Sequence, residues 1–334
     1  MSWRAKNRYE EDSTINYVTD INKVNKELVL TLAEFSVQAY NAFSSENPSL
    51  CGYSKSDAPA DYTFLACFSG VDSIFGVDDT VECFGLILRS KDAPYSYYIA
   101  FRGTDSVLDW VDDLGVEFDQ FVPYTGDSSS VSNVQVEAGF YDVYTESKNS
   151  VGDPDFTPSM QEQIFSCLDS CQSSEYKIDH LYITGHSLGA SLCEIFTLDF
   201  LVSRPGIAVT NINFACPRVG NDDFVTAYSN LISQNSSSST LRVQNTYDVV
   251  PCVPFGDGYT HMPDALLVAF YGEGIIEHEN LAERHSLNNY QAVLKCAAQS
   301  DNGVCINSNL EVTANGDSIT STMPDTTNVC SLFS

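Results

Sequence analysis

The feature that most constrains the fold is a serine flanked by glycines at the junction of an apolar strand and an apolar helix. The run Leu181-Tyr182-Ile183-Thr184 is continuously apolar, which is typical of a strand buried on both faces of a parallel sheet. Gly185-His186-Ser187-Leu188-Gly189 follows, and a helical pattern then extends from Leu188 to about Val202. A strand, a tight turn with a serine and a helix form the setting of a nucleophile elbow.

The two glycines have a physical reason to stand beside the serine. A turn of this kind is strained, and a Cβ at either flank would clash with neighbouring backbone. The helix that starts at Leu188 also directs the positive end of its dipole toward the serine oxygen. The alternative is a glycine-rich turn with an ordinary serine, but the strand before Ser187 and the helix after it favour a nucleophile.

Strand and helix patterns alternate along most of the chain. Strands are predicted at residues 81–88, 95–101, 181–184, 209–214 and 241–246, and helices within 21–43, from 158 to before 177, and at 188–202, 222–232 and 285–298. Such alternation implies right-handed crossovers. We therefore predict an α/β fold of the α/β-hydrolase type, with a mainly parallel central sheet and helices on both faces. Residues 21–298 are expected to form one domain, between a loose segment at 1–20 and a polar tail at 299–334 that could be partly disordered.

A serine hydroxyl is a good nucleophile only when a base takes its proton, and the base is usually a histidine held by a carboxylate. In this fold the acid and then the histidine follow the serine along the chain. Three histidines follow Ser187. His285 is favoured because it lies next to the start of the last predicted helix. His261, whose loop follows the last predicted strand, stays open as a competitor, whereas His278 stands between two glutamates and is typical of a solvated residue.

The acid is expected at the carboxyl end of the strand after the one that ends at Phe214. Asp248 meets this condition, because it follows the strand at 241–246. Asp257 and Asp264 lie in a longer loop and remain alternatives.

Two further aspartates, Asp222 and Asp223, come too early in the chain to be the acid. They are interpreted as the N-cap and the first turn of a helix.

Six short motifs occur in order between residues 26 and 298: Phe101-Arg102-Gly103-Thr104-Asp105, and residues 136–141, 184–189, 217–221, 248–251 and 285–290. In this order they resemble the motifs of the class 3, or fungal-type, triacylglycerol lipase family of the α/β-hydrolase superfamily. The resemblance implies that Ser187 is the nucleophile, Asp248 the acid and His285 the base. It also implies that Thr104, through its backbone N–H and hydroxyl, joins the Leu188 N–H in an oxyanion hole, where the loss of one donor typically slows the reaction about 10²–10³-fold.

The chain departs from the family pattern at several positions outside these roles. Glu137 stands where the family has a histidine, and Ala215 where it has a glycine. Tyr259-Thr260-His261 is similar to a family segment that lies outside the triad, which lowers His261 as the base. Pro263 replaces the glycine usually found just after that segment.

An amphipathic segment follows Thr104 directly. Its apolar residues are Val107, Leu108, Trp110, Val111 and Leu114, and three aspartates alternate with them. Four of the five apolar residues recur at helical spacing, and the family resemblance implies a lid at this place. We expect a short helix that covers the site in water and turns outward at a lipid surface, giving activation by interfaces.

Composition limits the partners. The chain has 45 acidic and 16 basic residues and a formal net charge of −29, which repels nucleic acid and anionic lipid headgroups. The sequence begins without an apolar signal region, and runs such as residues 265–271 are too short to cross a bilayer. The expectation is an intracellular protein, with a trimmed secreted form as the alternative.

The eleven cysteines are an odd number, so at least one thiol is unpaired or paired outside the chain. No CxxC pair or Cys/His cluster with zinc spacing occurs in the sequence. Four cysteines in apolar stretches are interpreted as small buried hydrophobes: Cys67, Cys83, Cys193 and Cys216. Disulfides are possible among Cys296, Cys305 and Cys330.

These patterns predict a carboxylic ester hydrolase that acts on acylglycerols or similar neutral esters, with no need for a metal or cofactor. The same residues would also serve a phospholipase, a galactolipase or a feruloyl-type esterase. The alternative from a different class of protein is a lipase-like scaffold that binds ligands without turnover. It is disfavoured because such scaffolds usually lose one triad member.

Overall fold

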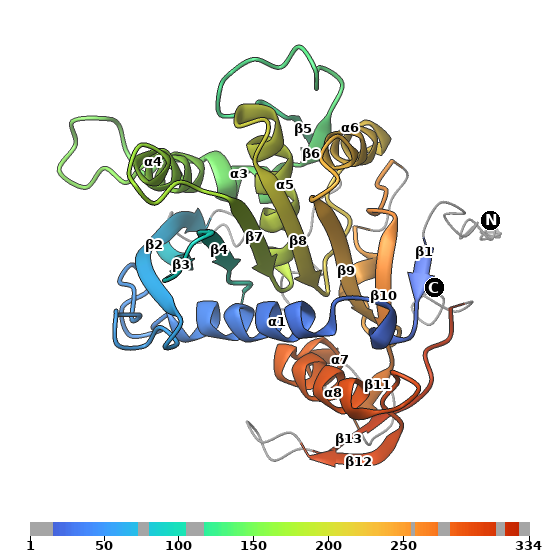
Figure 1. Cartoon of the computed structure of the whole chain (residues 1–334). Coiled ribbons are helices and arrows are strands. Elements are labelled where there is room, and N and C mark those ends of the chain that lie inside the picture. Colours follow the sequence, from blue (N-terminus) through green and yellow to red (C-terminus); the bar gives the residue numbers. More distant parts are fainter. Residues whose placement is uncertain are drawn as a thin grey trace, which may run out of the picture.

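An eight-stranded sheet forms the centre of the computed structural model, which describes residues 16–72, 80–104, 117–254, 258–272, 281–311 and 318–326 (Figure 1). The strand order is β1-β10-β9-β8-β7-β4-β3-β2. In chain order the strands are β1 (Asn16–Val18), β2 (Tyr62–Asp72), β3 (Thr80–Ser90), β4 (Ser96–Phe101), β7 (His180–Gly185), β8 (Ala208–Phe214), β9 (Ser239–Asn245) and β10 (Asp264–Val268).

The sheet is mainly parallel, as the sequence predicts. The pairs from β4 through β7, β8, β9 and β10 to β1 are parallel, and only β2, β3 and β4 pair antiparallel. Every residue of β8 is buried, as expected of a central strand of a parallel sheet that is covered on both faces. Because the parallel strands all point the same way, the loops after β4, β7 and β9 leave the same edge of the sheet.

Helices cover both faces of the sheet and enclose two hydrophobic cores (Figure 1). One core includes the buried side chains of α1 (Lys26–Asn41) and α8 (Leu287–Gln299), and α7 (Leu281–His285) precedes α8. The other includes those of α3 (Ala138–Thr145), α4 (Met160–Gln172), α5 (Leu188–Ser203) and α6 (Asp222–Ser233). Every residue of α5 except Val202 is buried, including the two acidic residues Glu194 and Asp199, which fits a helix that packs against other elements on nearly all sides.

The predicted helices and strands are confirmed to within a few residues, and several further elements were missed. The missed elements include β1, β2, β10, α3 and the short pair β5 (Phe118–Gln120) and β6 (Gln135–Glu137). Within the segment expected to be loose, β1 pairs with β10. Part of the polar tail forms β12 (Asn307–Glu311) and β13 (Ser318–Ser321), which build a three-stranded sheet with β11 (Phe270–Gly272).

The cysteines follow the prediction in part. Cys83, Cys193 and Cys216 are buried free thiols, and Cys296 forms a disulfide with Cys305. The interpretation of Cys67 was wrong, because it forms a disulfide with Cys51. Its apolar neighbours on β2 suggested burial, but the sequence pattern cannot show which loop packs against a strand.

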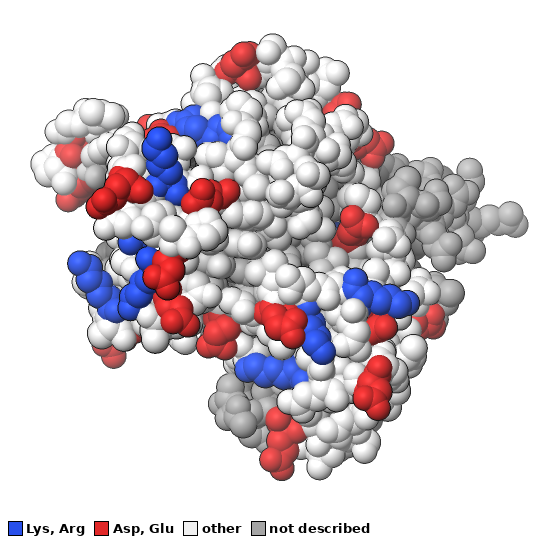
Figure 2. Space-filling model, in the orientation of Figure 1, with Lys and Arg blue, Asp and Glu red and all other residues white. Residues whose placement is uncertain are grey.

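Charges of both signs are interspersed on the face shown in Figure 2, and neither sign forms a continuous patch there. Among the described helices, none combines the length and apolar character that crossing a bilayer requires.

Candidate active site

Ser187 lies at the tight turn between β7 and α5. Its backbone has φ 60° and ψ −130°, a conformation that non-glycine residues rarely adopt and that marks a locally strained turn. The Ser187 N–H donates to the carbonyl of Phe214 on β8 at 3.1 Å. A Cβ on Gly185 would come within 2.5 Å of the Gly189 carbonyl oxygen. A glycine is therefore required at position 185, because strand β7 and helix α5 approach each other closely there.

The segment after β4 packs directly against this turn. A Cβ on Gly103 would lie 2.6 Å from the His186 carbonyl oxygen and 2.9 Å from Ser187 Cβ. A Cβ on Gly189 would lie 2.7 Å from the Arg102 carbonyl oxygen. These contacts bring Thr104, which is buried, into the neighbourhood of the first turn of α5. The first N–H groups of a helix lack acceptors within the helix, so this is a place where donors can converge on an oxyanion.

His285 and Asp248 form a buried hydrogen-bonded pair. His285 Nδ1 lies 2.8 Å from Asp248 Oδ2, and the two side chains are 2% and 1% exposed. Asp248 follows β9, and His285 is the last residue of α7. Because an ionised carboxylate only accepts hydrogen bonds, Nδ1 carries the proton toward Asp248. In the neutral ring Nε2 is then the basic nitrogen.

Two further donors hold the Asp248 carboxylate. The Val250 N–H donates to Oδ1 at 3.0 Å, and the Tyr290 hydroxyl donates to Oδ2 at 2.9 Å. Tyr290 in turn accepts a hydrogen bond from the Asn245 N–H at 2.7 Å. The Asn245 side chain donates to the Arg284 carbonyl at 2.9 Å. One buried network thus fixes both the end of β9 and the end of α7.

His186 links the serine turn to His285. Its Nε2 lies 2.7 Å from the His285 carbonyl oxygen, and its Nδ1 lies 2.8 Å from the Tyr40 hydroxyl on α1. A carbonyl can only accept, so Nε2 carries the proton and Nδ1 accepts from Tyr40. Burial, together with the neighbouring His285, holds the pKa of His186 well below its usual range. The ring therefore stays neutral and keeps this tautomer.

Sequence reasoning missed the supporting roles of Tyr40, His186, Asn245 and Tyr290. His186 and Tyr290 lie within motifs that the sequence singled out, but their partners are up to 146 residues away in the chain. Only the folded topology brings them together.

The serine oxygen and one imidazole nitrogen of the candidate site are unsatisfied in the part of the chain that the structure describes. Within the described residues neither Ser187 Oγ nor His285 Nε2 has a hydrogen-bond partner, although both atoms are buried. Buried polar groups are normally satisfied, and exceptions need a reason. A hydroxyl on a strained turn and an unsatisfied imidazole nitrogen provide a nucleophile and a base that can engage a reacting group.

The alternative base lies elsewhere. The Nε2 atom of His261 contacts the Pro251 carbonyl oxygen, and burial and the nearby Arg242 charge hold the pKa of His261 well below its usual range. It is Asp248 and His285, not His261, that form the pair.

Of the alternative acids, Asp264 lies on β10 and accepts from Asn16. Asp222, which comes too early in the chain to be the acid, accepts from Thr260. The N-cap of α6 is Asn221 rather than Asp222, which is in the first helical turn with Asp223. Three predictions fall outside the described residues: Asp257, His278 and the lid residues Val107, Leu108, Trp110, Val111 and Leu114.

The departures at Glu137 and Ala215 have structural explanations. Glu137 is the N-cap of α3 and accepts from the Phe140 N–H at 2.8 Å; burial raises its pKa to about 7. Ala215 has φ 52°, which explains why glycine is the usual residue there.

In the described residues one cluster of side chains could hold a metal ion. It consists of Cys51, Cys67 and Cys83 and includes none of the site residues above.

A mainly parallel sheet with a serine elbow after one strand and an Asp–His pair at later loops defines an α/β-hydrolase fold. The family model for "Lipase (class 3)" matches residues 98–258, a part of the chain that carries Ser187 and Asp248. The resemblance found in the sequence is confirmed.

The chain is also similar to curated relatives from plants. Phospholipase A1-II 3 of Oryza sativa subsp. japonica is 32% identical over 165 residues, which cover 46% of this chain and 38% of the relative. Phospholipase A1-IIgamma of Arabidopsis thaliana is 27% identical over 204 residues, covering 58% and 46%. The chain therefore spans less than half the length of these curated relatives.

The fold is shared with solved lipases. The crystal structure of Lip2 lipase from Yarrowia lipolytica aligns with a TM-score of 0.57 at 21% identity and covers 75% of this chain and 80% of that one. The Rhizomucor miehei lipase propeptide complex aligns with a TM-score of 0.51 at 21% identity, covering 76% and 73%. At this level of identity the likeness concerns the fold.

Proposed function

We propose that this chain hydrolyses carboxylic esters of acylglycerols or similar neutral lipids. The observation that carries the proposal is the buried pair of His285 and Asp248, with Nδ1 and Oδ2 2.8 Å apart, beside a strained serine turn. The match of residues 98–258 to the class 3 lipase family model supports the same chemistry.

In this proposal Ser187 Oγ attacks the ester carbonyl while His285 Nε2 takes its proton. Asp248 stabilises the imidazolium that forms. The N–H groups of Thr104 and Leu188, with the Thr104 hydroxyl, hold the oxyanion of the tetrahedral intermediate. The imidazolium then gives its proton to the departing alcohol, which leaves the acyl group on Ser187. A water molecule attacks this acyl-enzyme while His285 takes its proton, and the imidazolium returns a proton to Ser187 Oγ as the acid product leaves.

The test of this chemistry is hydrolysis of short-chain and long-chain p-nitrophenyl esters. We expect Ser187→Ala and His285→Ala each to lower kcat by about 10⁴-fold or more, because triad members act as a unit. His261→Ala is the matched histidine variant and is expected to retain turnover, provided that it folds. Turnover by Ser187→Ala at the wild-type rate would refute the proposed nucleophile. Undiminished activity of His285→Ala would move the base elsewhere, and no turnover by any folded protein would favour a binding scaffold.

The second candidate substrate class is phospholipid, because the curated relatives at about 30% identity are named phospholipase A1. The net charge of −29 disfavours anionic surfaces. Rates should therefore be compared on triacylglycerol, phosphatidylcholine and phosphatidylglycerol at equal interfacial area. We expect the neutral triacylglycerol to be cleaved fastest and the anionic phospholipid slowest; a preference for either phospholipid would replace the proposed substrate class.

The segment after Thr104 is proposed as the lid on the basis of its sequence pattern. We expect the rate on a partly soluble ester to rise when the ester passes its critical concentration. Equal rates on monomeric and micellar ester would contradict interfacial activation.

A further inference from the structure

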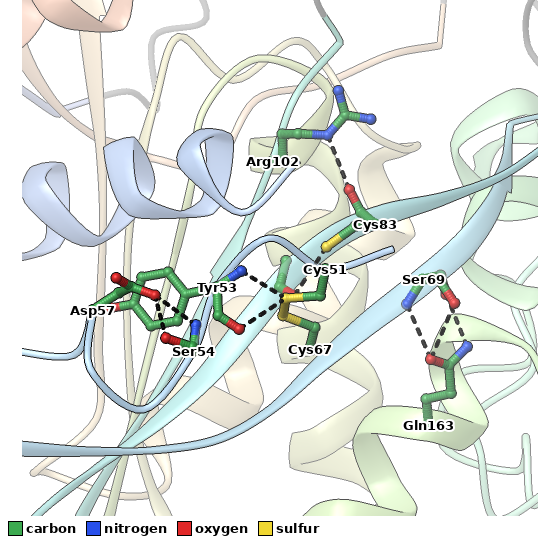
Figure 3. Close-up of a disulfide and its surroundings, with 10 residues drawn as sticks. Cys51, Tyr53, Ser54, Asp57, Cys67, Ser69, Cys83, Arg102 and Gln163 are labelled. Atoms are coloured by element: carbon green, nitrogen blue, oxygen red, sulfur yellow. Dashed lines mark hydrogen bonds between the residues drawn. A yellow bond between two sulfur atoms is a disulfide. The ribbon is translucent and has the colours of Figure 1, made fainter. Parts of the chain in front are cut away.

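Three cysteine sulfurs converge at the antiparallel end of the sheet, outside the proposed active site. Cys51 lies in the loop before β2, Cys67 on β2 and Cys83 on β3, and their sulfur atoms all lie within 4.8 Å of one another. Cys51 and Cys67 form a disulfide, while Cys83 is a buried free thiol (Figure 3). No sequence motif indicates this group, because each cysteine is 16 residues from the next.

The backbone holds the three positions together independently of the disulfide. β2 and β3 pair antiparallel, with Ser69 opposite Cys83. The loop that carries Cys51 is attached on both sides, because the Cys83 N–H donates to the Pro48 carbonyl at 2.8 Å and the Gly52 N–H donates to the Ala42 carbonyl at 2.7 Å. Reduction of the disulfide therefore leaves three thiols in one place.

The spacing suits a thiolate-binding cation. Zn²⁺ binds cysteine sulfur at about 2.3 Å in a tetrahedron, which places neighbouring sulfurs about 3.8 Å apart. Sulfurs that already lie within 4.8 Å reach that spacing by small side-chain rotations. Three protein ligands leave the fourth position of the tetrahedron to a water molecule.

Two donors lie close to the three cysteines. Arg102 Nε donates to the backbone carbonyl of Cys83 at 3.1 Å (Figure 3), and the Arg102 guanidinium also pairs with Glu82. The Tyr53 N–H donates to Cys51 Sγ at 3.4 Å. Cys51 and Cys67 are half-buried, whereas Cys83 is buried.

We propose that Cys51, Cys67 and Cys83 bind one Zn²⁺ ion when the Cys51–Cys67 disulfide is reduced. A dithiol reductant transfers two electrons and two protons to the disulfide, which becomes two thiols, and the reductant itself becomes a disulfide. Zn²⁺ then replaces the three thiol protons, which are released to solvent. The oxidised chain has one free thiol in the cluster and does not form the site.

The test uses the full chain carrying Cys167→Ser and Cys171→Ser, which removes a second thiol pair on α4. The protein is reduced with a phosphine under argon and titrated with Cd²⁺, an analogue whose ultraviolet charge-transfer band scales with the number of bound thiolates. We expect saturation at one ion with three thiolates. We expect Cys83→Ser to lose about a third of the band and to bind Zn²⁺ at least about tenfold more weakly in competition with a chromophoric chelator.

Two controls keep the result interpretable. Cys296→Ser with Cys305→Ser removes a different disulfide and should leave the band unchanged. Cys67→Ser changes a half-buried residue and should weaken the band as Cys83→Ser does, which covers the case that the buried substitution prevents folding. Equal Cd²⁺ bands and equal Zn²⁺ affinities in the reduced parent and in folded Cys67→Ser would overturn the proposal, and so would an equal band in the oxidised parent.

Discussion

The imidazole of His186 lies against His285, with its Nε2 atom 2.7 Å from the His285 carbonyl oxygen and the two ring centroids 4.5 Å apart. The residue before the proposed nucleophile therefore holds the backbone of the proposed base. This contact depends on one tautomer of His186, which the Tyr40 hydroxyl stabilises from α1 at 2.8 Å.

Tyr40→Phe is the first prediction. The substitution leaves Nδ1 of the buried His186 without this donor, which should lower the free energy of unfolding by about 1–3 kcal/mol. The ring is then less firmly held, so kcat should fall by about tenfold with little change in KM. Tyr53→Phe is the matched control, since the Tyr53 hydroxyl donates at 2.6 Å to Gln38, which lies on α1 as Tyr40 does. It should lose stability but keep kcat; equal kcat losses in both variants would contradict the role given to His186.

Tyr290→Phe removes a donor to Asp248 and leaves the buried Asn245 N–H without its acceptor. We predict a drop of about 1–3 kcal/mol in the free energy of unfolding and a fall in kcat of about tenfold. Urea unfolding and ester hydrolysis measure the two effects. Tyr228→Phe is the control, because Tyr228 is also buried but donates to Thr240 away from the site. A destabilised Tyr290→Phe with wild-type kcat would mean that the phenol serves only stability.

Gly103→Ala places a methyl group 2.4 Å from the Tyr40 hydroxyl and 2.9 Å from Ser187 Cβ. Neither the serine turn nor the segment toward Thr104 can keep its position, so kcat should fall by about 10²-fold or more. Gly52→Ala is the control, because its new Cβ would meet the Ala42 carbonyl oxygen at 3.4 Å. If Gly103→Ala retained full activity in a folded protein, the packing of this segment on Ser187 would not matter for the reaction.

Glu194 predicts a pH dependence of stability. Burial raises its pKa to about 7 from 4.5, although the Arg242 charge acts in the opposite direction. The folded state thus binds the proton more tightly than the unfolded state. The stabilisation of the folded state by protonated Glu194 is fully present below about pH 4.5 and is lost as pH rises through about 7. The free energy of unfolding changes by on the order of 3 kcal/mol over this range.

Glu194→Gln tests this sign, because glutamine stays neutral at every pH. The free energy of unfolding of the wild type minus that of Glu194→Gln should fall between about pH 5 and about pH 8 in urea titrations. A difference that is constant or rises with pH would contradict the raised pKa.

Much of the sheet was predictable because most residues of β7, β8 and α5 are buried, and the apolar residues among them mark out each element in the sequence. β10 was missed since its five residues resemble any short apolar run. The strands of the tail could not be predicted because β13 pairs with β11, which lies in a distant part of the chain.

The candidate site was predictable to a similar degree. Local pattern placed Ser187 on its turn, and chain order pointed to Asp248 and His285. The hydrogen bonds from Tyr40 and Tyr290 join α1 and α8 to the site, and no local pattern encodes such contacts.

The central claim is that Ser187 is an activated nucleophile, and covalent labelling tests it most directly. A p-nitrophenyl alkylphosphonate should release one equivalent of p-nitrophenol per chain, and mass spectrometry should find the phosphonyl group on Ser187. Labelling should be slowed by about 10³-fold or more in His285→Ala, since the hydroxyl then lacks its base. A label on another residue, or no label on a folded wild-type chain, would contradict the account.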